Sequence, residues 1–171
     1  MIAVFVIHLA IPIQMAIFQE TILRQGREYK FRTQPIDPYD AFRGRYIALS
    51  FEEANKNNQN EYKSKIYLPI GVGEDGFAVI KDVLIEKPES GDFVIAKTNK
   101  YFPYRIILPF DRYYINENLA NLGQKVLDTS SEEKDAYALV KVHKGNCALK
   151  ELYIKDKPIL EYLREIEDRI K

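Results

Sequence analysis

The chain has 171 residues, and its 25 Lys and Arg residues are balanced by 25 Asp and Glu residues, so no net charge draws it toward nucleic acid or an acidic partner. A hydrophobic content of 46%, with 12 Tyr and 9 Phe, indicates a folded chain with a real core. The single cysteine, Cys147, excludes an internal disulfide and a cysteine-based zinc cluster.

The first 23 residues contain the most hydrophobic run of the chain. The run MIAVFVIHLAIPIQMAIF is interrupted only by His8, Pro12 and Gln14 and carries no charged side chain. As a helix, residues 2–23 would extend about 33 Å, close to the roughly 30 Å hydrocarbon layer of a bilayer. We therefore predict a transmembrane anchor over residues 1–23. A cleaved signal peptide and a buried core helix are the alternatives, although no A-x-A-like cleavage site follows the run.

Residues 24–36 read as a juxtamembrane strand or linker. Tyr29, Phe31 and Thr33 alternate there with charged residues, which is the period of a strand. Four basic residues follow the hydrophobic run and none precedes it: Arg24, Arg27, Lys30 and Arg32. By the positive-inside rule, this asymmetry would leave the body of the protein in the cytoplasm.

The rest of the body, residues 37–158, alternates between strand patterns and turn signals. The strand candidates are RYIALSFE, KIYLPIGV, FAVIKDVLIEK, GDFVIAKT, YRIILPF, AYALVKVH and ALKELYIK. Turns are predicted at Asp75-Gly76, Ser90-Gly91 and Lys144-Gly145. Helical spacing of apolar residues predicts a short helix over 116–127 and a C-terminal amphipathic helix over 159–171. The expected class is mainly β (α+β), with antiparallel sheets.

A weak internal echo links two parts of this domain. DGFAVIKDVLIEKP, residues 75–88, resembles KGNCALKELYIKDKP, residues 144–158, and each follows an alternating strand that begins at a tyrosine. The echo suggests two related hairpin lobes or a doubled sheet, while chance similarity between two hairpins is an equal alternative.

The stretch IDPYDAFRGRYIALSFEE, residues 36–53, is the most specific in the chain. It follows the pattern D-P-x-D-x-x-R-G-x-Y-x-x-L at seven positions: Asp37, Pro38, Asp40, Arg43, Gly44, Tyr46 and Leu49. With the hydrophobic N-terminus and the later PFDRYYINENLANLGQKV, it resembles the GDYXXLXY family over nearly the whole chain. The resemblance implies a single-pass membrane anchor, a body outside the cytoplasm, and a frequent association with polytopic membrane proteins. It implies no established biochemical activity.

Two positions depart from the family signature, and they favour a structural role for the stretch. Arg45 stands where the family has Asp, which would reverse the charge of any general base or metal ligand there. Phe51 replaces the last Tyr and keeps the ring while losing the hydroxyl, as a packing position would. We therefore expect four residues of the signature to be structural: Pro38, Gly44, Leu49 and Phe51.

A ligand site in the same stretch is the alternative. Four side chains could face away from the core and converge on a ligand: Asp37, Asp40, Arg43 and Tyr46. Arg43 could equally pair with Asp37 or Asp40 and hold the turn closed. Convergence of the four side chains would make a binding site, whereas the pairing of Arg43 would only stabilise the turn that begins the strand.

Few residues in this sequence could form any other kind of catalytic site. His143 and Cys147 flank a glycine turn, but two half-buried strand residues explain them better than a nucleophile and its base. The sequence contains no P-loop, G-x-G-x-x-G or H-E-x-x-H motif, and we expect no cofactor and no metal. Six aromatic residues could line a sugar or peptide groove, or form core and cross-strand pairs: Tyr101, Phe102, Tyr104, Phe110, Tyr113 and Tyr114.

The sequence thus predicts a β domain anchored at the cell membrane, with its body outside the cytoplasm. We expect it to be a binding or assembly module for an integral-membrane partner, without a nucleic-acid partner. A hydrolase or ligand-binding enzyme that uses Asp37, Asp40 and Arg43 is the alternative function.

Overall fold

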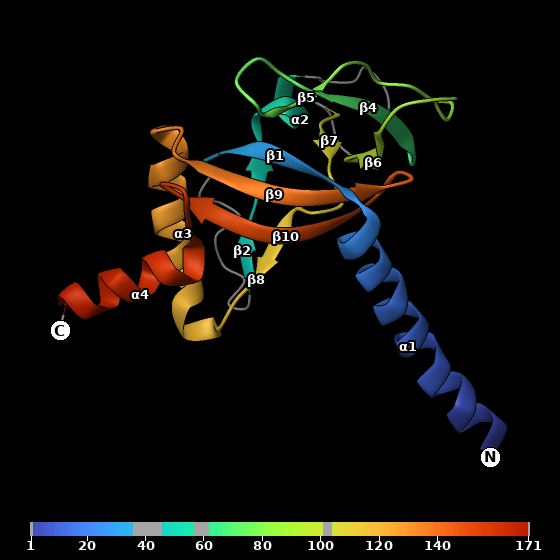
Figure 1. The fold of residues 1–171 in the computed structure, drawn as a ribbon, viewed down its shortest axis with the longest axis horizontal. Coiled ribbons are helices and arrows are strands. Elements are labelled where there is room, and N and C mark those ends of the chain that lie inside the picture. The colour runs from blue at the N-terminus through green and yellow to red at the C-terminus, as the bar shows by residue number, and fades with distance from the viewer. Residues whose placement is uncertain (1, 36–45, 57–61, 101–103, 171) are drawn as a thin grey trace.

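The computed structural model describes residues 2–35, 46–56, 62–100 and 104–170. A long N-terminal helix, α1 (Ile2–Gln25), leads into a body of three sheets, and two further helices lie on the opposite side of these sheets from α1 (Figure 1). The predicted β-rich architecture of antiparallel sheets with a few short helices is confirmed.

The largest sheet has five strands in the order β11-β10-β9-β1-β3. Its strands are β1 (Arg27–Gln34), β3 (Ser50–Phe51), β9 (Ala136–His143), β10 (Asn146–Ile154) and β11 (Lys157–Pro158). β1 pairs antiparallel with β9, and Tyr29 lies opposite Val140. Tyr29, Phe31 and Thr33 face the core, because successive strand residues point to opposite faces.

The other two sheets complete the body. One has the order β5-β4-β6-β7, formed by β4 (Ile66–Val72), β5 (Ala78–Ile80), β6 (Phe93–Thr98) and β7 (Ile106–Ile107). The other pairs β2 (Tyr46–Ala48) with β8 (Arg112–Tyr114). A parallel bridge between Val94 and Gly145 connects β6 to the turn between β9 and β10.

The two echoed segments form hairpins that belong to different sheets. β4 and β5 pair in the four-stranded sheet, and β9 and β10 pair in the five-stranded sheet. The predicted strand FAVIKDVLIEK ends early, since β5 stops at Ile80. Lys81 then donates its backbone N–H to the Pro69 carbonyl at 2.9 Å. The predicted strand YRIILPF shrinks to β7, because it enters a turn at Pro109 and Phe110.

Helices cover the core from outside. α3 (Glu117–Glu132) begins at Asn116, whose side chain accepts a hydrogen bond from the Asn118 N–H, and it buries Leu127. α4 (Ile159–Ile170) buries Ile159 and Leu163 completely. A short helix, α2 (Glu52–Lys56), directly follows β3 and was not predicted from the sequence.

The last turn of α1 packs on the body, whereas most of the helix extends away from it (Figure 1). Ile22 is 2% exposed, and the Gly26 N–H donates a 2.8 Å hydrogen bond to its carbonyl. Within the described part of the chain, no helix has both the length and the apolar character needed to cross a membrane. The prediction of a transmembrane span over residues 1–23 is therefore not supported.

Candidate functional site

The signature stretch changes its pairing partner half-way along. β2 pairs with β8, so that Ile47 lies opposite Tyr113, and β3 pairs with β1. Between them, the Leu49 N–H donates a 2.9 Å hydrogen bond to the Asp111 carbonyl. Because one stretch serves two sheets, a change in it would disturb both.

Packing fixes the inward side of this stretch. Ile47, Leu49 and Phe51 are all buried. The Phe51 ring lies 6.0 Å from the Phe31 ring and 5.1 Å from the Phe110 ring, centroid to centroid. These rings belong to β3, β1 and the turn before β8, so Phe51 stabilises the junction of the sheets.

A side chain of α3 takes the place of a neighbouring strand beside β2. Gln124 Oε1 accepts a 2.9 Å hydrogen bond from the Ala48 N–H, and Gln124 Nε2 donates to the Ala48 carbonyl at 3.4 Å. Gln124 Nε2 also donates to Asp128 at 3.1 Å. This pairing satisfies backbone groups that a short strand would otherwise leave open.

A cleft of about 340 Å³ lies against the signature stretch. Tyr46, Ser50 and Phe51 line one side. Ala48 and Leu49 of the same stretch also line it, and the other lining residues come from α2, β7, β8 and the segments beside them: Ala54, Asn55, Asn99, Arg105, Ile106, Ile107, Leu108, Asp111 and Arg112. Apolar walls with a few polar groups are typical of a ligand-binding cleft.

The lining of this cleft includes an aromatic ring beside a positive charge. Tyr46 is half-buried, and its ring lies 5.8 Å from the ring of Tyr114, its partner across the β2–β8 pair. The Arg112 guanidinium lies 5.0 Å from the Tyr46 ring, within cation–π range. Arg112 also forms a 3.7 Å ion pair with Asp111, and about half of each side chain is exposed. The hydrogen bond to Tyr114, followed by the charge of Asp111, raises the pKa of Arg112.

Such a cleft is suited to holding a polar or anionic group. Among the described lining residues, Arg105 and Arg112 supply two permanent positive charges, and Asp111 supplies the one carboxylate. Asn55 and Asn99 add amide groups. Among the residues that the structure describes, no group of three or more His, Cys, Asp or Glu side chains could hold a metal ion.

The residues expected at the ligand site are only partly placed. Tyr46 lines the cleft, and Leu49 and Phe51 lie in the core beside it. Asp37, Pro38, Asp40, Arg43 and Gly44 lie outside the described residues. The alternative that Asp37, Asp40 and Arg43 converge with Tyr46 on a ligand therefore stays a prediction.

The strand register separates His143 from Cys147. Cys147 lies opposite Val142, whose side chain is buried, whereas His143 lies opposite Asn146. Neighbouring residues on a strand point to opposite faces, so the imidazole and the thiol do not face each other. Burial raises the pKa of Cys147 to about 12, which is the wrong direction for a nucleophile.

The aromatic residues of the same region have separate roles. Phe110 is in the core, and Tyr113 donates a 2.8 Å hydrogen bond to Glu151 across the sheets. Burial, followed by this hydrogen bond, raises the pKa of Tyr113. Tyr114 is 71% exposed and lies beside Tyr46, which lines the cleft. Tyr101 and Phe102 lie outside the described residues.

The sequence model of a family described as GDYXXLXY protein matches residues 8–152. The chain belongs to the GDYXXLXY family. No curated protein and no solved structure matches it. The family is of uncharacterised function, so membership assigns no activity to the cleft.

The matched region of this GDYXXLXY protein contains the whole cleft. It runs from α1 to β10 and includes β2, β3, β7 and β8. The second departure from the family signature, Phe51, lines the cleft and packs against the rings of Phe31 and Phe110.

Proposed function

We propose that this GDYXXLXY protein is a binding or assembly module that α1 holds at a membrane. The observation that carries the proposal is the apolar surface of α1. Five large apolar residues on it, Ile11, Ile13, Met15, Ile17 and Phe18, are between 50% and 68% exposed.

These side chains surround the helix. At helical spacing Ile11, Met15 and Phe18 share one side, and Ile13 and Ile17 share the opposite side. A helix that is apolar all round is stable when it is buried in a large protein or in a membrane. Figure 1 shows this part of α1 away from the body, so the body does not bury it. Lipid is the environment that covers every side at once.

Flotation with lipid vesicles tests this proposal. We expect the full chain to float with phosphatidylcholine vesicles and the variant Met15→Glu with Phe18→Glu to remain in the soluble fraction. The matched control is Tyr62→Glu with Val72→Glu, which places the same charges on exposed apolar residues of the body. A full chain that stays soluble without detergent and does not float would overturn the proposal.

The body would then bind its partner through the cleft beside the signature stretch. Tyr46, Arg112 and Tyr114 form a partly exposed aromatic and cationic surface, which is the composition found at binding hot spots. We propose an integral-membrane protein as the partner. A photo-crosslinking residue at Tyr114 should capture a protein of the membrane fraction in intact cells. The same residue at exposed Tyr62 should capture none, and equal capture at both positions would contradict this role for the cleft.

We also propose that the body lies outside the cytoplasm. The family resemblance implies this side of the membrane, whereas the four basic residues after the hydrophobic run favour the cytoplasm by the positive-inside rule. A reporter fused after Lys171 that is active only outside the cytoplasm tests the side directly. An inactive reporter on a membrane-bound fusion would assign the body to the cytoplasm.

A further inference from the structure

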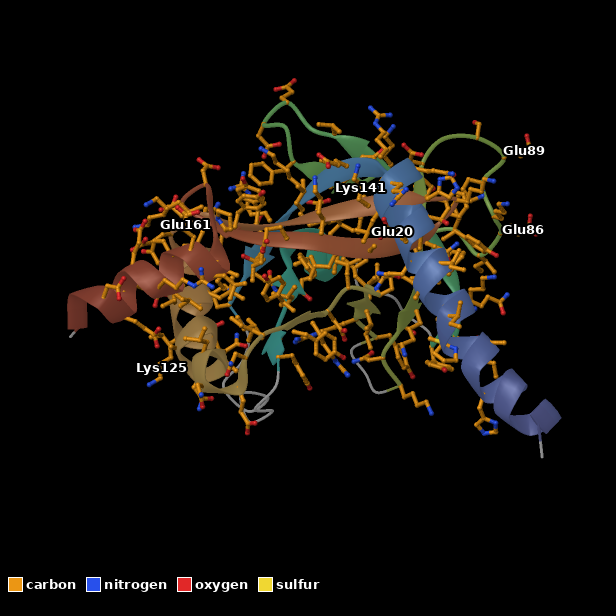
Figure 2. The ribbon with its side chains drawn as sticks, turned by 60° about the horizontal axis from the view of Figure 1, so that its bottom comes forward. Glu20, Glu86, Glu89, Lys125, Lys141 and Glu161 are labelled. Carbon is orange, nitrogen blue, oxygen red and sulfur yellow. The ribbon has the colours of Figure 1, made fainter. Side chains whose placement is uncertain are left out.

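A second cleft, of about 370 Å³, lies where α1 joins the body. Its walls come from three parts of the chain: Gln25 and Arg27 at the junction of α1 and β1, the segment 87–93 that leads into β6, and the turn 142–145 between β9 and β10. Figure 2 shows the loop of Glu86 and Glu89 on the same side of the molecule as α1, with Lys125 at the opposite end.

Positive charge is in excess in this cleft. Arg27, Lys87 and Lys144 line it together with His143, against Glu89 and Asp92. The Asp92 carboxylate already has two side-chain partners. It accepts a 2.6 Å hydrogen bond from the Tyr29 hydroxyl and lies 3.6 Å from the Arg27 guanidinium.

The two lysines are available to a ligand. Lys87 and Lys144 are exposed, and the Lys87 ammonium lies 5.8 Å from the centroid of the Phe93 ring. Among the described residues, neither ammonium forms an ion pair with a carboxylate. Two unneutralised ammonium groups and an imidazole at one cleft favour an anion with several acceptor oxygens.

The position of the cleft along α1 indicates the source of that anion. Phe18 is the last large apolar residue exposed on α1, and Glu20 and Arg24, which form a 2.6 Å ion pair, are the charged residues that follow it. Gln25 lies about 10 Å beyond Phe18 along the helix. The headgroup layer is roughly 5–8 Å thick on each side of the hydrocarbon. With α1 along the membrane normal and its apolar part in lipid, the Gln25 end of this cleft lies just outside the headgroup layer, from where the long lysine side chains can extend back toward the phosphates.

We propose that this cleft binds the phosphate-containing headgroup of an anionic phospholipid, with Lys87 and Lys144 as the charged ligands and His143 as a hydrogen-bonding partner. The inference rests on the proposed attachment of α1 to a membrane. It adds a lipid preference that apolar insertion alone would not give. Basic clefts beside a membrane helix recognise headgroups in this way.

Vesicle binding separates the two proposals. The full chain should bind vesicles of phosphatidylcholine mixed with phosphatidylglycerol more tightly than vesicles of phosphatidylcholine alone. Lys87→Gln with Lys144→Gln should lose about 25-fold of the affinity for the mixed vesicles, at roughly fivefold per lysine, and keep its affinity for the neutral ones. The control Lys125→Gln with Lys155→Gln removes the same charge from the groove beside α3 and α4. If the control variant lost as much affinity for the mixed vesicles, this cleft would not be the binding site for the headgroup. If neither the unmodified chain nor the two variants bound neutral vesicles, the proposed attachment of α1 to a membrane would be refuted instead.

Nuclear magnetic resonance of the full chain in neutral micelles identifies the ligand. Short-chain phosphatidylglycerol should shift the amide signals of Gly91 and Gly145 and the His143 imidazole signals, and short-chain phosphatidylcholine and inorganic phosphate should not. Shifts with inorganic phosphate alone would show a site for a soluble anion and overturn the lipid assignment. The absence of shifts with either anion would overturn the site itself.

Discussion

The Tyr29 hydroxyl donates a 2.6 Å hydrogen bond to Asp92 Oδ2, and this contact connects the first strand of the body to the segment that leads into β6. Tyr29 is 3% exposed, and Asp92 also pairs with Arg27 at the start of β1, just after α1. One carboxylate therefore links the helix junction, the five-stranded sheet and the four-stranded sheet. Its neighbour Gly91 has φ of +84°, which lets the chain turn into β6 at that point.

We expect Tyr29→Phe to lower the free energy of unfolding by about 1.5–3 kcal/mol, because it removes a buried hydrogen bond to a charged acceptor. Urea unfolding measures this loss, and Tyr62→Phe on the surface is the control. A loss no larger than that of the control would show that the contact contributes little.

The same hydrogen bond predicts a dependence on alkaline pH. Burial, followed by the bond to Asp92, raises the pKa of Tyr29 to about 12, whereas an unfolded tyrosine ionises near pH 10. The stabilisation is fully present below about pH 10 and is lost as the pH rises through about 12. The stability difference between the unmodified chain and Tyr29→Phe should therefore shrink across that range. A constant difference would mean that Tyr29 ionises alike in both states.

The orientation of α1 depends on the absence of a side chain at Gly26. A Cβ there would lie 2.5 Å from the Ile22 carbonyl oxygen and 3.1 Å from the Val142 nitrogen, both backbone atoms that cannot turn aside. We expect Gly26→Ala to destabilise the protein by about 1–3 kcal/mol and to displace α1 from β9. Unfolding at constant detergent concentration measures the loss, with Gln25→Ala as the control. Equal stability of the two variants would show that the junction adapts.

Local patterns in the sequence predicted most of the elements, because alternation and helical spacing depend on residues close in the chain. β1, β4, β6, β9 and β10 follow such patterns, and the predicted C-terminal helix begins at Ile159 as expected. The β2–β8 pair and the β1–β9 pair bring together residues far apart in sequence, such as Ile47 and Tyr113, and nothing local signals those pairings. β8 and α2 are too short for their periodicity to be recognised.

The candidate sites were harder to predict for the same reason. Tyr46 belongs to the signature, but its neighbours Arg112 and Tyr114 come from a strand more than 60 residues later. The lysines of the second cleft come from two segments far apart in the chain, residues 87–93 and 142–145, and no local pattern indicates that these segments meet. Gln124 was equally hidden, since a glutamine on a helix gives no sign that it will pair with a strand.

The pairing of Gln124 with the Ala48 backbone makes a prediction for the signature stretch. Gln124→Ala should cost roughly 1–2 kcal/mol, because it removes two hydrogen bonds from the half-buried backbone of Ala48. The Ala48 amide should also exchange its hydrogen faster. Asn121→Ala, on an exposed position of α3, should change neither quantity. Unchanged exchange at Ala48 in Gln124→Ala would show that the side chain does not protect β2.

The thiol of Cys147 distinguishes a structural strand residue from a nucleophile. Burial raises its pKa to about 12, so at pH 8 only about one molecule in ten thousand carries a thiolate. We expect a disulfide reagent to label the folded protein very slowly at that pH and the urea-unfolded protein at the rate of a free cysteine. Raising the pH above the unfolded thiol's pKa should weaken folding, because the unfolded chain then ionises more readily than the folded one. Cys147→Ser should bind vesicles as the unmodified chain does. Rapid labelling of the folded chain at pH 8 would instead show an activated thiol and reopen an enzymatic role for the β9–β10 turn.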